Sequence, residues 1–275
     1  MPWVALPDGT HTLGVSPDGV ALVAVGERVM VISVASGERL VDVPPQALPI
    51  DGLVSMAVAN GAARIVLAQG YPLLWQPFGG RPYLLGKLAQ VNQVGITADG
   101  RYVSVRASLA SALYAIDGPT LWKDDHEAVP TLATDGTVVL LRDSSGWTMR
   151  TLPELDVVER LEEPTGELAR PISVLQADTL AVFRDASELI IADGPDQLVS
   201  FPNLLRRRVV CADRFVIWHS GGSWLEVFDV RARALHARIA CPGAWSAEGG
   251  YVAVQVAGRA CVLRLADLPP GEQVP

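Results

Sequence analysis

The chain has 275 residues, of which 49% are hydrophobic and 19% are charged, and its formal net charge is −8. This composition supports a packed core and is too apolar for a disordered chain. The negative charge argues against general binding to nucleic acid or to an anionic membrane, although a local basic patch is compatible with it.

The cysteines and the first residues indicate a reducing compartment. Cys211, Cys241 and Cys261 are isolated and form no Cys-x-x-Cys spacing. The opening segment MPWVALPDGT lacks the basic and apolar regions of a secretory signal. No apolar run reaches the roughly 18–20 residues that a membrane span needs. We therefore expect buried thiols, without disulfides, in a cytoplasmic protein.

The first structural unit covers residues 11–44, where four short apolar segments alternate with turns. Its second segment, Val20–Val25, is rich in β-branched residues and follows the turn Ser16–Gly19. An apolar run of this length between turn residues is typical of a buried strand, since a helix would need about 10–12 residues. Further strands are expected at Val29–Val34 and Leu40–Val43. Such a sheet buries both faces only when similar sheets pack against it.

The same unit recurs along the whole chain with a polar marker in its first turn. These markers are Asp18, Asn60, Asp99, Asp135, Asp178, Asp213 and Glu248. Their mean spacing is about 38 residues, and such a period with four short strands per unit is typical of a β-propeller. We therefore predict an all-β fold: a single domain over residues 1–275, forming a seven-bladed β-propeller with four antiparallel strands per blade. The expected blades cover residues 10–44, 52–88, 91–123, 128–162, 170–201, 207–240, and 243–266 together with 2–6.

The last unit has three evident strands and is followed by the Pro-rich segment Ala266–Pro275, a poor candidate for a fourth strand. The N-terminal segment Trp3–Leu6 is a spare strand that ends at Pro7. We therefore expect this N-terminal strand to complete the last blade and close the ring, which would limit exposed sheet edges. The alternative is a frayed N-terminus.

Four consecutive segments carry a family resemblance: Ser16–Gly19, Ala21–Val25, Val31–Val34 and Ala35–Glu38. Together they resemble the repeat of WD40/YVTN-type propellers, and the chain as a whole is similar to bacterial, quinoprotein-like members of that superfamily. It departs from true WD40 repeats because no Trp-Asp pair ends a third strand; Phe228-Asp229 is the nearest match. The resemblance implies a protein that binds other proteins. Some similar bacterial propellers belong to multi-protein systems with an AAA+ ATPase and a von Willebrand-type A domain.

Basic residues recur where the second strand of a unit ends. The positions, in chain order, are Arg106, Arg142, Arg184, His219 and, as a neutral member, Gln255. Arg206, Arg207 and Arg208 follow in a connection expected on the same face. Guanidinium groups that converge there would suit a carboxylate or phosphate partner. The alternative is that Arg142 pairs with Asp143, and Arg184 with Asp185, as solvated strand ends.

Three aromatic residues lie next to the same loops: Tyr71, Trp147 and Trp224. If exposed, they would anchor a protein interface. The alternative is that they pack against neighbouring blades.

No motif for catalysis stands out in the sequence. The polar run Lys123–Glu127 is expected to be a solvated loop, because consecutive residues on an extended chain do not converge on one metal ion. No nucleophile elbow, phosphate-binding loop or dinucleotide fingerprint occurs. We therefore predict no catalytic residue, no metal and no cofactor. The expected function is a non-catalytic scaffold or adaptor whose partner is a protein with an acidic or aromatic-anchored surface, without nucleic-acid or membrane binding. The alternative is a small-molecule-binding or hydrolytic, lactonase-like propeller that uses its axial pocket.

Overall fold

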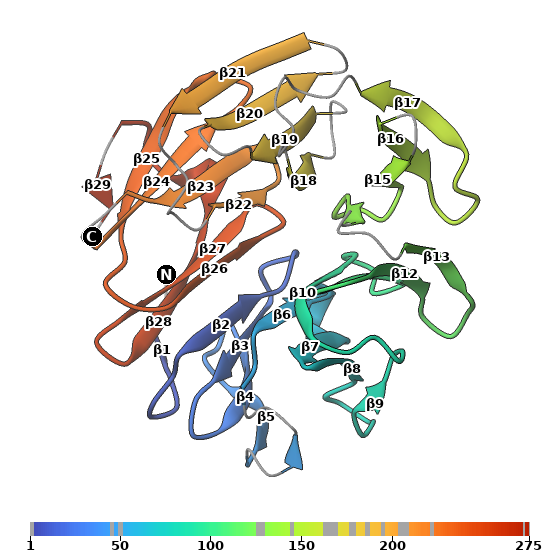
Figure 1. Ribbon diagram of the computed structural model, residues 1–275. Helices are drawn as coiled ribbons and strands as arrows, with labels where there is room; N and C mark the ends of the chain where they lie inside the picture. The colour runs from blue at the N-terminus through green and yellow to red at the C-terminus, as the bar shows by residue number, and fades with distance from the viewer. Residues whose placement is uncertain are drawn as a thin grey trace.

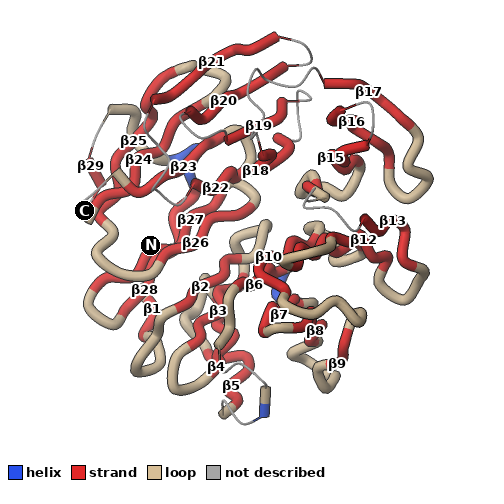
Figure 2. Tube along the Cα trace, in the orientation of Figure 1, coloured by secondary structure: helices blue, strands red, loops and turns tan. Residues whose placement is uncertain are grey.

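The computed structural model describes residues 3–44, 47–48, 52–124, 130–143, 146–161, 170–175, 180–184, 188–193, 196–202, 209–220, 223–271 and 273–274. For residues 143, 161 and 273–274, and for the strands between 170 and 202, the description is of the backbone alone. These residues form β-sheets arranged radially around one axis (Figures 1 and 2). Two short 3-10 helices, η2 (Asn60–Ala62) and η3 (Leu265–Asp267), accompany the sheets within this described part. No helix of the described chain is long and apolar enough to cross a membrane.

Six of the sheets in the described chain are four-stranded, antiparallel blades. They contain β2 (Thr12–Val15), β3 (Ala21–Val25), β4 (Val29–Ser33) and β5 (Arg39–Val43); β6 (Ser55–Val58), β7 (Ile65–Gln69), β8 (Tyr71–Trp75) and β9 (Tyr83–Leu84); β10 (Val91–Ile96), β11 (Tyr102–Ala107), β12 (Ser111–Ala115) and β13 (Thr120–Asp124); β14 (Thr131–Leu132), β15 (Val138–Asp143), β16 (Gly146–Thr151) and β17 (Val157–Leu161); β18 (Arg170–Leu175), β19 (Leu180–Arg184), β20 (Glu188–Asp193) and β21 (Asp196–Pro202); and β26 (Trp245–Glu248), β27 (Tyr251–Val256) and β28 (Arg259–Arg264) with β1 (Val4–Ala5).

The remaining sheet has five strands and corrects the predicted architecture. It consists of β22 (Val209–Ala212), β23 (Phe215–His219), β24 (Trp224–Asp229), β25 (Ala234–Ala240) and β29 (Gln273–Val274). The prediction of seven four-stranded blades is therefore wrong: the described residues form six blades of that kind. The Pro-rich tail, a poor candidate for the fourth strand of the last blade, instead places β29 parallel to β25, with Gln273 opposite Arg238. This pairing covers part of an outer edge that would otherwise present unpaired backbone groups.

The hydrophobic core lies between neighbouring blades. Every residue of β3 is buried, because the central strands of stacked sheets have neighbours on both faces. One core cluster joins Val23 of β3 to Ile65 of β7, and the next joins Val66 of β7 to Val103 of β11. A continuous apolar run in the sequence is thus the natural pattern for an inner strand of this ring.

The N-terminal strand closes the ring as predicted. Val4 pairs with Ala260 in an antiparallel ladder between β1 and β28. The Leu6 N–H then donates to the Gly258 carbonyl at 3.1 Å. Because Val4 is also buried, the strand contributes apolar contact as well as backbone hydrogen bonds.

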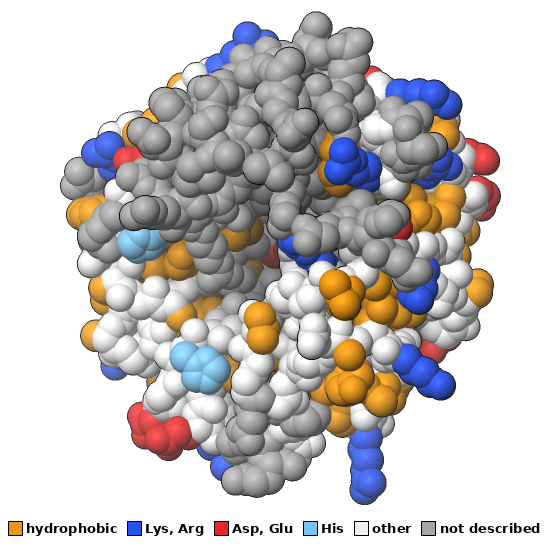
Figure 3. Space-filling view, in the orientation of Figure 1, with side chains coloured by type: hydrophobic (Ala, Val, Ile, Leu, Met, Phe, Trp, Pro, Cys, Tyr) orange, Lys and Arg blue, Asp and Glu red, His pale blue; other side chains and the backbone are white. Residues whose placement is uncertain are grey.

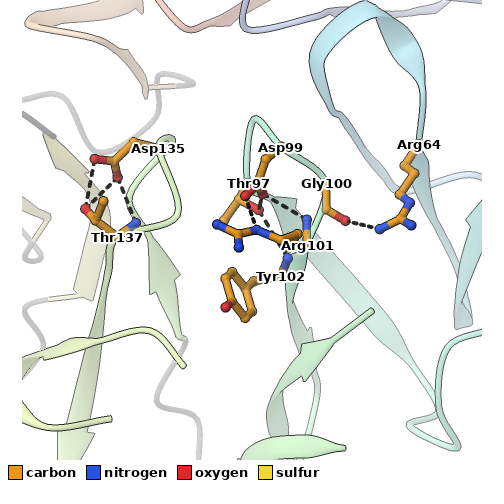
Figure 4. Close-up of polar contacts among 8 residues, drawn as sticks. All are labelled: Arg64, Thr97, Asp99, Gly100, Arg101, Tyr102, Asp135 and Thr137. Carbon is orange, nitrogen blue, oxygen red and sulfur yellow. Dashed lines mark hydrogen bonds and ion pairs between the residues drawn. The ribbon is translucent and has the colours of Figure 1, made fainter. Parts of the chain in front are cut away.

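An aspartate in the first turn accepts hydrogen bonds from its own turn in several blades, and Figure 4 shows two of these turns. The Thr97 hydroxyl donates to Asp99 Oδ1 at 2.6 Å, and the Arg101 N–H donates to the same oxygen at 2.9 Å. Burial alone would raise the pKa of Asp99, but these bonds and the Arg101 guanidinium outweigh it and hold that pKa below its usual value. In the next blade the Thr137 N–H donates to Asp135 Oδ1 at 3.0 Å. The acidic markers of these two turns therefore serve the turns themselves.

Glu248 does not share this role. It is the last residue of the inner strand β26 and pairs directly with Tyr251 across a two-residue turn. Its counterpart in the first blade is Ser16, which lies at the equivalent end of the β2–β3 hairpin. The Ser16 N–H donates to the Ala21 carbonyl there. Glu248 therefore stands where other blades carry small residues, and its grouping with the turn markers is corrected.

Candidate binding sites

The residues predicted at the ends of the second strands occupy equivalent positions in the ring. We call them the arginine row: Arg106, Arg142, Arg184, His219 and Gln255. In each of these blades, the first and second strands form a hairpin, and one residue of the second strand closes it by pairing with the last residue of the first strand or with the residue directly after it. Each member of the row lies four residues after that second-strand residue. Those hairpin residues are Tyr102, Val138, Leu180, Phe215 and Tyr251. Equal offsets along equivalent strands put the whole row at one level, on the face of the ring opposite the first turns.

The side chains of the row differ in their surroundings. Arg142 is exposed, and its guanidinium carbon lies 5.9 Å from the centroid of the Trp147 ring, which faces it across the β15–β16 ladder. Arg106 and His219 are half-buried. Gln255 accepts the Ala244 N–H at 3.2 Å, so its side chain braces its own blade.

Other members of the predicted site lie beyond what the structure describes. Arg206, Arg207 and Arg208 fall outside the described residues, as does Asp185. Arg184 is placed by its backbone only, at the end of β19. The alternative pairing of Arg142 with Asp143 involves a side chain that is not described either.

The three aromatic candidates have separate outcomes. Trp147 is only 3% exposed, so its ring is not available on the surface as an interface anchor would be. Trp224 is half-buried at the start of β24. Tyr71 is 49% exposed on the face of the arginine row, next to the turn between β7 and β8.

Tyr71 belongs to an apolar rim that sequence reasoning did not find. We define this rim as Val54, Tyr71 and Leu109, which are all exposed. Backbone bonds connect its loops: the Val91 N–H donates to the Gly70 carbonyl at 3.1 Å, and the Ser108 N–H donates to the Gln90 carbonyl at 3.2 Å. Figure 3 shows hydrophobic side chains gathered over the blades from β6 to β13. The available signal was a large apolar residue inside a loop, as at Leu109.

An axial cavity of about 280 Å³ lies among the inner strands β6, β10, β14, β22 and β26. Figure 3 shows the ring hollowed at its centre. Glu248 is the one charged side chain among the described residues that line this cavity. The charge that the described lining brings to the axis is therefore a carboxylate.

The Glu248 carboxylate accepts a hydrogen bond from across the ring. The Thr134 hydroxyl, in the first turn of the β14–β17 blade, donates to Glu248 Oε1 at 3.2 Å. The two residues belong to blades that are not neighbours. Desolvation deep in the ring raises the pKa of Glu248 to about 7, although the Thr134 hydroxyl and the Gly249 N–H partly offset that rise. No cluster of three or more metal-ligating side chains occurs within the described part of the chain.

The cysteines are thiols, as expected from their spacing. Cys241 and Cys261 are buried, whereas Cys211 is half-buried and lines the axial cavity. Burial raises the pKa of the Cys261 thiol above its ordinary value, which disfavours the reactive thiolate.

Comparison with known proteins gives the fold. No protein-family model matches the chain, and no curated protein matches it in sequence. Among solved structures, the β-propeller domain of Cps50 (Swd1) from Myceliophteria thermophila is similar, with a TM-score of 0.62 and 11% sequence identity. The match covers 96% of this chain and 99% of that one. At such low identity the likeness concerns the fold alone, and it agrees with the β-propeller predicted from the repeats. The chain therefore has the fold of the WD40-like β-propellers.

Proposed function

We propose that this protein is a non-catalytic interaction scaffold that binds a partner protein on the face carrying the arginine row. The observation that carries the proposal is the shared register of Arg106, Arg142, Arg184 and His219 in consecutive blades. A propeller fold accommodates many functions, so the fold supports a scaffold role without specifying it.

The charge distribution favours an acidic partner. The chain has a formal net charge of −8, yet the row collects basic residues on one face. Guanidinium groups bind carboxylates through paired hydrogen bonds, and complementary charge also accelerates association. The Trp147 ring lies next to the Arg142 guanidinium and supports it through a cation–π contact.

The apolar rim adds the second element of a protein interface. Val54, Tyr71 and Leu109 are exposed close to the blade that carries Arg106. Interfaces derive much of their affinity from a few aromatic and apolar contacts surrounded by polar ones. An extended partner segment with acidic residues and an apolar anchor would use the row and the rim together.

The resemblance to bacterial propellers is compatible with one class of partner. We infer a protein of a bacterial multi-protein system, either an AAA+ ATPase or one with a von Willebrand-type A domain. Co-purification of the tagged chain from its native host, with mass spectrometry of the bound proteins, tests this inference.

Charge reversal tests the binding face itself. We expect Arg106→Glu and Arg142→Glu each to weaken partner capture roughly tenfold, about 1.4 kcal/mol, because the new carboxylate repels an acidic partner that the arginine attracts. Arg81→Glu is the matched control, since Arg81 is exposed between β8 and β9, on the opposite face. Equal capture by the wild type and both row variants would refute the proposed face.

A further inference from the structure

The walls of the axial cavity are built from sheet edges. β6, β10, β14, β22 and β26 are each the innermost strand of their sheet and have a ladder partner on one side only. Such strands present backbone N–H and C=O groups on their open side. The hydroxyl-bearing residues Ser55, Ser104, Thr131 and Ser246 are also among the lining residues. The cavity therefore offers many neutral hydrogen-bond acceptors.

The charge that the described residues contribute to this cavity is negative. Glu248 contributes a carboxylate, and no Lys or Arg is among the described residues that line the space. Glu248 is half-buried and lies in a desolvated cavity, and a desolvated carboxylate without a cationic partner is costly, so such groups are usually paired or take up a proton. Glu248 has two neutral donors, the Thr134 hydroxyl and the Gly249 N–H. Those donors orient the carboxylate without neutralising it.

We propose that the axial cavity binds a small organic molecule with a primary ammonium group, which pairs with the Glu248 carboxylate. This inference is independent of the proposed scaffold function, because the two use different residues. Glu248 ends an inner strand, whereas the arginine row ends the second strands on the opposite face.

The chemistry of the site selects this class of ligand over others. An anion would meet the carboxylate, so anionic ligands are disfavoured. Calcium prefers six to eight oxygen ligands, often from several carboxylates, and the described lining supplies one. A guanidinium group binds best to both carboxylate oxygens in a fork, whereas an ammonium is a compact charge with three donors. One oxygen of Glu248 and the surrounding neutral acceptors satisfy an ammonium.

The size of the cavity sets the size of the ligand. About 280 Å³ lies just below the usual range of roughly 300–1,000 Å³ for drug-sized ligands. We therefore expect a metabolite-sized amine rather than a peptide. The pKa of Glu248, which desolvation raises to about 7, should fall when an ammonium binds, because an adjacent positive charge favours the ionised carboxylate.

Calorimetric titration with defined probes tests the site. Ethanolamine and putrescine are the ammonium probes; ethylene glycol is the neutral control, and potassium chloride tests for a simple inorganic cation. We expect both amines to bind the wild type and to bind Glu248→Gln at least tenfold more weakly. Glu154→Gln is the matched control, because Glu154 is an exposed turn residue between β16 and β17, and it should bind the amines like the wild type.

A second measurement does not depend on any variant. Near pH 7, amine binding should release protons from Glu248, which is seen as a dependence of the binding heat on the ionisation enthalpy of the buffer. Absence of amine binding, equal binding by Glu248→Gln, equal competition by potassium chloride, or binding without proton release would each overturn the proposal. The Arg106 and Arg142 variants test the proposed scaffold function separately.

Discussion

Gly249 lies against Pro17 at the seam where the last blade meets the first. A Cβ atom placed on Gly249 would lie 2.5 Å from the Pro17 Cα and closer still to the Pro17 carbonyl oxygen. Gly249 also has a φ of +52°, in the left-handed region that favours glycine. The ring therefore closes through a backbone contact that tolerates no side chain, in addition to the β1–β28 pairing.

We expect Gly249→Ala to lower the free energy of unfolding by roughly 3 kcal/mol or more, because backbone overlap adds to left-handed strain. Gly37→Ala is the control, since Gly37 has a φ of +72° and open space around it. That change should cost only about 1 kcal/mol. Urea denaturation of both variants measures the difference, and similar costs would contradict the proposed contact at the seam.

The stability of the protein should depend on the protonation of Glu248. Its pKa rises from an ordinary value of 4.5 to about 7 on folding. Between these pH values the folded state therefore holds a proton that the unfolded state has released. This contribution is fully present below about pH 4.5 and is lost as pH rises through about 7. Its upper size is roughly 3 kcal/mol.

Glu248→Gln removes this titration because the amide stays neutral. We therefore expect the stability of the wild type, relative to the variant, to fall between about pH 5 and pH 8. Denaturation curves at several pH values measure this difference, and other titrating groups cancel in the comparison. A constant difference across the range would show that Glu248 titrates normally.

Asp229 should be a major stabilising residue of the five-stranded sheet. It is buried, and its Oδ1 accepts the N–H groups of Arg231 at 2.9 Å and Ala232 at 3.1 Å. Its Oδ2 lies 3.1 Å from Arg214 Nε. We expect Asp229→Ala to cost roughly 2 kcal/mol, because it leaves two turn N–H groups and the half-exposed Arg214 guanidinium without their acceptor.

Asp229→Asn separates the two contributions of this side chain. The amide oxygen can still accept the turn N–H groups, so the loss should be smaller than for alanine and reflect mainly the ion pair. Thermal unfolding of the two variants provides the comparison. An alanine variant as stable as the wild type would contradict the role assigned to this turn.

Arg64 links two neighbouring blades. Its Nη1 donates to the Gly100 carbonyl at 2.9 Å, as Figure 4 shows, and its Nη2 lies 3.2 Å from Asp117 Oδ2. We expect Arg64→Met to cost about 1–2 kcal/mol through the lost bond to the carbonyl. Asp117→Asn should cost less than about 0.5 kcal/mol, because an exposed ion pair contributes little. Chemical denaturation distinguishes them; equal losses would place the effect in the ion pair.

Several features of the site could be predicted from the sequence alone. The positions of Arg106, Arg142 and Arg184 followed from counting along each strand, because a strand advances by a fixed rise per residue. The burial of Trp147 could not be predicted in this way, since it depends on what packs against the strand. The loop residue Leu109 gave a local signal, but its exposure next to Tyr71 depends on how adjacent blades meet.

The sequence by itself determined the all-β ring, its repeat and the closing role of Trp3–Leu6, because turn residues and short apolar runs act locally. Only the tertiary structure decided the strand count and the axial site. The tail strand β29 pairs with β25 through backbone bonds, which do not require a particular sequence pattern in either strand. Glu248 and Thr134 are separated by more than a hundred residues in the chain, yet they share one hydrogen bond, because closure of the ring brings distant blades to a common axis.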